Sequence, residues 1–171
     1  MKRAILEEVV VFNMLFNAQE FYPNECFGSL WGNISGRDYV VKGAIPHPTI
    51  ESQLDELFLS ERLEKLLRKK YEPITYMKFI GDYHSHPRNK KVEADVSISF
   101  QDKMDLDGQM LSIIIGIKYE PGRDKVWSYV DGRTLTGRFG LYRVEMAAYA
   151  KIGSSKRIQR IPLLCPHLPG V

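Results

Sequence analysis

The chain has 171 residues, of which 44% are hydrophobic and 26% are charged, a balance typical of a single globular domain. The net charge of +3 is too small to indicate nucleic-acid binding, and the basic runs at 68–70, 88–91 and 156–160 are typical of solvated faces. Two cysteines are too few for a disulfide framework, and no apolar stretch approaches the roughly 18 to 20 residues that span a bilayer. The N-terminus is charged where a signal peptide is apolar, so we expect a soluble, cytoplasmic protein without a membrane partner.

The first half of the chain predicts two long helices and a hairpin. Apolar residues recur with helical spacing over about 7–20 and again over 49–70. Between these two helices, the runs 25–33 and 39–44 have the composition of strands, and they should pair as a hairpin through the turn at Gly36.

The second half predicts four more strands and a shorter helix. Hydrophobic residues at 76–80 indicate a strand, and 93–104 has the pattern of a short helix. The β-branched run at 111–117 is typical of a central strand covered on both faces. Two further strands are expected at 125–131 and 140–146, with an Asp-Gly turn signal between them.

These elements add up to an α/β fold with a three-layer-like α-β-α arrangement. We expect a single mixed β-sheet of about six strands, flanked by the two long helices and the shorter one. The domain should cover residues 1–150, and a basic, proline-rich tail should follow over 151–171.

Two histidines stand at the end of the predicted strand that begins at 76. Because side chains alternate along a strand, His84 and His86 should share one face while Ser85 points to the other. Pro87 has no backbone N–H and should end the strand. With a nearby carboxylate such as Asp95, the two imidazoles would form an open three-ligand zinc set that leaves a fourth position for water.

The segment from His84 to Pro87, a downstream carboxylate and an upstream glutamate together resemble the JAMM (MPN+) metalloprotease family. That family has a glutamate near the start of the domain, then His-x-His-Pro, then an acidic ligand on a following helix. Residues 23–32 resemble the first-strand segment of the family, and its glutamate falls on Glu25, 59 residues before His84 (84 minus 25). The resemblance is to prokaryotic members and covers roughly residues 10–119.

The resemblance leaves two candidates for the acidic ligand. Members usually carry Ser-x-x-Asp after the histidines, and its literal match ends at Asp102, sixteen residues beyond His86. That spacing is long for the loop of the family, and it puts Asp102 about two turns past the predicted helix start. Asp95 lies nine residues beyond His86, in a run (93–96) that resembles prokaryotic members. We therefore predict Asp95, with Asp102 as the alternative.

Choosing Asp95 places Val92 at the serine position of the motif. In the family this serine helps to hold the catalytic water or the transition-state oxyanion, and valine can do neither. Losing one such donor typically costs about 10²- to 10³-fold in kcat. Ser99, one helical turn beyond Asp95, would then be the candidate substitute.

The resemblance implies one Zn²⁺ per chain and zinc-dependent hydrolysis of a peptide or isopeptide bond. Glu25 would act as general base towards water and then as general acid towards the leaving amine. The substrate would be a ubiquitin-like protein conjugate, or a small carrier protein or peptide. Because of Val92, the alternative is a catalytically weak interaction scaffold of MPN type that still binds zinc.

Overall fold

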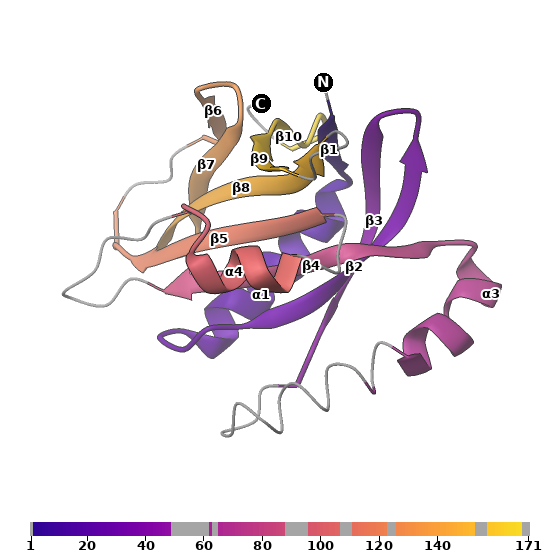
Figure 1. The fold of residues 1–171 in the computed structure, drawn as a ribbon. Helices are drawn as coiled ribbons and strands as arrows, with labels where there is room; N and C mark the ends of the chain where they lie inside the picture. Colours follow the sequence, from indigo (N-terminus) through magenta and orange to yellow (C-terminus); the bar gives the residue numbers. More distant parts are fainter. Residues whose placement is uncertain are drawn as a thin grey trace.

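The computed structural model describes residues 2–48, 62, 65–87, 96–106, 111–122, 126–152 and 157–168. Figure 1 shows that this part of the chain is mostly β-structure, with helix α1 on one side of a long sheet and helix α4 on the other. The helices are α1 (Glu8–Phe21), α3 (Glu72–Thr75) and α4 (Phe100–Asp105). The strands are β1 (Arg3–Leu6), β2 (Phe27–Ser35), β3 (Asp38–Pro46), β4 (Lys78–Pro87), β5 (Leu111–Tyr119), β6 (Ser128–Val130), β7 (Thr134–Phe139), β8 (Tyr142–Ile152), β9 (Arg157–Ile161) and β10 (Leu163–Leu164).

The ten strands among the described residues belong to one mixed sheet, in the order β10-β1-β3-β2-β4-β5-β8-β7-β6, with β9 paired to β8. The final strands make this sheet curl. Strand β9 pairs with β8, whereas β10, which follows directly, pairs with β1 near the other end of the strand order. Between them the carbonyl of Pro162 accepts the N–H of Ala4 at 2.9 Å. The sheet is therefore bent into a half-barrel.

The concave side of the sheet encloses the main core around α1. Strand β5 alternates, so that Ile113 and Ile115 face this core while Ile114 faces a second cluster on the opposite side. Helix α1 buries Val10, Val11, Met14, Leu15 and Ala18 in the main core. The second cluster contains Val96, Leu106, Ile114, Ala147 and Tyr149. Both faces of β5 are buried, which confirms the prediction of a covered central strand.

The predicted α/β architecture with about six strands between helical layers is wrong. The described ranges contain ten strands, of which β1, β7, β9 and β10 were not anticipated. Strands β1 and β10 have only four and two residues, too short to show an alternating pattern. Strand β7 is interrupted by Gly137 and Arg138, and β9 carries two arginines in a basic segment, so neither forms a continuous apolar run.

Of the three predicted helices, one is confirmed, one lies mostly outside the described residues and one is wrong over part of its range. Helix α1 confirms the first, at 7–20. The predicted helix at 49–70 falls mostly outside the described residues, although 65–70 are helical. The predicted helix at 93–104 is wrong over 96–99, which are not helical, and 93–95 lie outside the described residues. Helix α4 begins at Phe100 because Ser99 caps it: the Ser99 Oγ accepts the N–H of Asp102 at 3.1 Å.

Residues assigned from the sequence to a C-terminal tail contribute to the sheet, since both β9 and β10 lie beyond residue 151. Tyr129 on β6 also binds this segment, because its hydroxyl accepts the backbone N–H of Cys165 at 2.8 Å. Across the described ranges, no helix has the length and apolar character needed to cross a membrane.

Candidate metal centre

Strand β4 presents its two histidines on the face opposite the main core. Tyr83 belongs to that core and Ser85 is fully buried, whereas the imidazoles of His84 and His86 lie together on the other side. In the sheet, His84 pairs with Phe27 of β2 on one side and with Ile114 of β5 on the other. The alternation predicted from the sequence is confirmed.

Helix α4 brings a carboxylate to these imidazoles. The oxygens of Asp102 lie 3.3 Å from His84 Nε2 and 3.7 Å from His86 Nε2. The two Nε2 atoms are 3.1 Å apart. One ligand atom from each of the three side chains therefore lies within 4.8 Å of the others, and the group can hold a metal ion.

The carboxylate is held in place by the start of its own helix. Ser99 and Asp102 form a reciprocal capping box, in which the Asp102 carboxylate accepts the Ser99 N–H at 2.7 Å and the Ser99 hydroxyl accepts the Asp102 N–H. The segment before the helix is anchored to the sheet by Val96, whose carbonyl accepts the hydroxyl of Tyr149 at 2.8 Å. These contacts fix Asp102 in the first turn of α4, over the histidines.

Two imidazole nitrogens and one carboxylate oxygen fit zinc, which takes three such protein ligands in its open sites. Both Nε2 atoms point to the same place, which requires each imidazole to be neutral with its proton on Nδ1 when a metal is bound. The side chains of His84 and Asp102 are only 9% and 13% exposed, so the donors are shielded from bulk water.

Charge and burial have opposite effects on the pKa values of His84 and Asp102. Burial lowers the pKa of His84, but the hydrogen bond to Asp102 and the negative charges of Asp82, Asp102 and Glu25 outweigh it, so the pKa is raised. Burial raises the pKa of Asp102, but hydrogen bonds from His84 and Ser99 outweigh it, and its pKa falls well below the usual range. The site thus favours a positive charge beside an ionised carboxylate.

Glu25 lies two residues before the start of β2, whose first residue, Phe27, pairs with His84. It is exposed, and its charge contributes to the raised pKa of His84. Its neighbour Cys26 is bonded to the strand that carries the imidazoles, because the Cys26 N–H donates to Ser85 Oγ at 2.9 Å. Phe27 follows, with its ring stacked 5.9 Å from that of His84 and 40% exposed.

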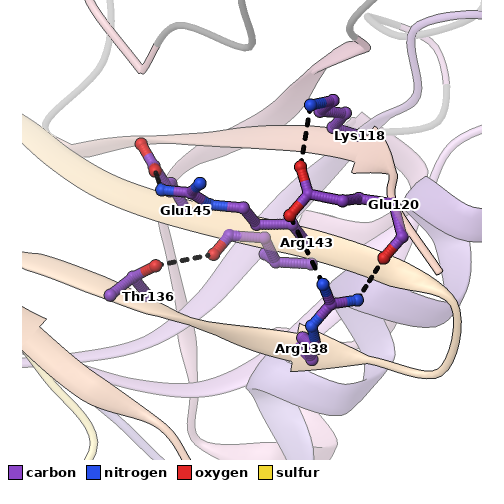
Figure 2. A network of polar contacts seen from close by, with 7 residues as sticks. Lys118, Glu120, Thr136, Arg138, Arg143 and Glu145 are labelled. Atoms are coloured by element: carbon purple, nitrogen blue, oxygen red, sulfur yellow. Dashed lines mark hydrogen bonds and ion pairs between the residues drawn. The ribbon is translucent and has the colours of Figure 1, made fainter. Parts of the chain in front are cut away.

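A network of charged side chains lies on β7, on β8 and at the end of β5 (Figure 2). Lys118 is two residues along β5 from Gly116, the partner of His86 in the sheet. Glu120 accepts from Lys118 at 2.7 Å and pairs with Arg138 at 3.3 Å, and Arg138 also donates to the Glu120 carbonyl. These contacts fix the backbone where β5 ends.

The structure thus brings His84, His86 and the alternative ligand Asp102 together, with Ser99 beside Asp102 and Glu25 near His84. Asp95 and Val92 lie outside the described residues. Asp102 was placed second partly because its spacing from His86 is long for the loop of the family, and partly because the helix was expected to start at about 93. Ser99 to Asp102 has the pattern of a capping box, which is the signal that places the helix start at Phe100 and Asp102 in its first turn.

No family model matches the chain, and a search of curated proteins finds no match. Among solved structures, the chain is similar to the solution structure of protein DSY2949 from Desulfitobacterium hafniense, with a TM-score of 0.58 and 18% identity over 95% of this chain and 92% of that one. It is also similar to AF2198 from Archaeoglobus fulgidus, a JAB1/MPN domain protein, with a TM-score of 0.49 and 16% identity over 96% and 99% of the two chains. The likeness to DSY2949 is one of fold.

Proposed function

We propose that this protein is a zinc-dependent peptidase of the JAMM type, which hydrolyses a peptide or isopeptide bond. The observation that carries the proposal is the convergence of His84, His86 and Asp102, and the negative charge of Glu25 acts on His84. Their order along the chain, with glutamate first, then His-x-His-Pro, then Ser-x-x-Asp, is the pattern that the sequence shares with that family.

His84, His86 and Asp102 would hold one Zn²⁺. When bound, zinc would supply a Lewis acid that polarises a substrate carbonyl and lowers the pKa of water towards about 7. Glu25 would take a proton from the attacking water and deliver it to the leaving nitrogen. A carboxylate that is exposed to solvent suits this proton transfer, and Glu25 is exposed.

Under this proposal the third ligand is Asp102 and the motif serine is Ser99. The support is positional, because the capping box holds Ser99 and Asp102 together over the histidines. The Ser99 hydroxyl accepts the Asp102 N–H and keeps its own proton, which it can donate to a developing oxyanion. With Ser99 in that position, the reasoning that made Val92 a defect no longer applies.

The substrate that we propose is a ubiquitin-like protein conjugate or a short peptide. An extended peptide end would reach the exposed acid and the metal ligands from the solvent side of β2, where Phe27 offers an apolar surface. A partly exposed phenyl ring stacked on a ligand imidazole can pack against an apolar side chain next to the cleaved bond.

The experiment compares Glu25→Gln with Glu20→Gln, an exposed glutamate on α1, in zinc-loaded protein. We expect Glu25→Gln to keep its zinc and to lose cleavage of ubiquitin-like conjugates or peptides, while Glu20→Gln cleaves like the wild type. Full activity in Glu25→Gln would remove Glu25 from the mechanism. A zinc-loaded wild type that cleaves none of these substrates would favour the interaction scaffold.

A further inference from the structure

Ser85 stands between the two histidines in sequence but points away from them. It is completely buried, and its backbone N–H donates to the carbonyl of Cys26 at 3.0 Å. The Ser85 hydroxyl accepts the backbone N–H of Cys26 at 2.9 Å. Regular pairing of β2 with β4 begins at Phe27. Ser85 therefore extends the attachment by one residue, to the neighbour of Glu25.

A second set of contacts holds the start of β2 from the side of the main core. Asn17 of α1 is buried, and its side-chain amide donates to the Tyr83 hydroxyl at 2.9 Å and to the Phe27 carbonyl at 3.3 Å. Gly28 lies on the Tyr83 ring so closely that an added Cβ would be 2.2 Å from Tyr83 Cε1. The start of β2 is thus clamped to β4 on the side opposite the histidines.

The hydroxyl of Ser85 is costly to bury, and the contact it makes is specific. A core position of this size could hold alanine without any polar group to satisfy. Removing the hydroxyl would leave the Cys26 N–H without this acceptor in a buried site. What the bond secures is the backbone next to Glu25, since Cys26 and Glu25 are adjacent.

We propose that Ser85, supported by Asn17 and Tyr83, is a positioning residue that sets the place of Glu25 relative to His84 and His86. This inference rests on the proposed function. Strand β4 presents both imidazoles on one face. On its other face, the hydroxyl of Ser85 holds Cys26, the neighbour of the proposed general base Glu25. A reacting group displaced by about 1 Å can cost on the order of 100-fold in rate, so this bond should influence turnover rather than metal binding.

The test uses a matched pair, Ser85→Thr and Ser85→Val. The two replacements have the same shape, but only threonine keeps the hydroxyl. Ser85→Ala serves as the second hydroxyl-free variant if valine does not fit the core. The readouts are zinc content, kcat and KM on a ubiquitin-like conjugate or peptide, and hydrogen exchange of the Cys26 amide in metal-free protein. Ile80→Val, a buried neighbour on β4, controls for a general loss of packing.

We expect Ser85→Val and Ser85→Ala to keep one zinc per chain, to lose about 10- to 100-fold in kcat with little change in KM, and to lose exchange protection at Cys26. Ser85→Thr and Ile80→Val should retain both kcat and protection. The inference is overturned if the valine variant keeps the kcat of the threonine variant, whether or not protection changes, or if Ile80→Val loses as much. A wild type that shows no zinc-dependent cleavage would refute the proposed function instead. Equal Cys26 protection in the valine and threonine variants would then still overturn the role of Ser85.

Discussion

The cap of helix α4 should control how well the site binds metal. Ser99 donates its backbone N–H to the carboxylate of Asp102 and accepts the Asp102 N–H on its hydroxyl. Ser99→Ala removes the second of these bonds and frees the first turn of the helix. Replacing an N-cap serine by alanine typically costs about 0.5–2 kcal/mol.

Two magnitudes follow from that cost. For a domain of this length, a loss of about 1 kcal/mol lowers Tm by about 2–4 °C. If the whole loss fell on the orientation of Asp102, zinc affinity would drop by about 2- to 30-fold, since about 1.4 kcal/mol corresponds to tenfold. Zinc affinity is measured by competition with a chelating dye, and Tm is measured in metal-free protein.

Ser99→Asn separates the cap from other effects, because asparagine caps helices as well as serine does. We expect this variant to recover both Tm and zinc affinity. Ser128→Ala, an exposed serine on β6, should change neither. The reasoning is refuted if Ser99→Ala binds zinc as tightly as the wild type, because the capping box would then not orient a ligand.

Two further results are expected. The carboxylates around His84 outweigh the effect of its burial and raise its pKa, so zinc must displace a proton from this imidazole. The apparent zinc affinity should therefore fall as the pH decreases, starting above the normal imidazole range. An affinity that is constant from pH 8 to pH 6 would contradict this. Phe27→Ala should leave zinc content unchanged and raise KM for substrates with an apolar residue beside the cleaved bond by about 10-fold, the effect of losing an apolar contact of about 1–3 kcal/mol; equal KM values for apolar and polar substrates in the wild type would contradict the apolar surface.

The sequence was most informative where a local rule governs the outcome. Alternation along β4, which ends at Pro87, was enough to place His84 and His86 on one face. The β-branched run of β5 was enough to identify a covered strand. In both cases the pattern depends on neighbours in the chain and not on distant contacts.

The sequence was least informative where pairing decides the structure. Strand β9 has few apolar residues and β10 has only two residues, and they are strands because β8 and β1 provide partners for them. The position of Asp102 depended on where one helix begins, and helix boundaries are set by caps that are easily overlooked beside an apolar pattern. The contact of Ser85 with Cys26 joins residues 59 positions apart and has no local signature.

The most direct test of the central claim is the zinc content of purified wild type, Asp95→Ala and Asp102→Ala, measured by elemental analysis. We predict about one zinc per chain in the wild type and in Asp95→Ala, and loss of the metal in Asp102→Ala, because open zinc sites need three protein ligands. A wild type that takes up no zinc, or an Asp102→Ala variant that keeps zinc while Asp95→Ala loses it, would contradict the assignment of His84, His86 and Asp102 as the metal site.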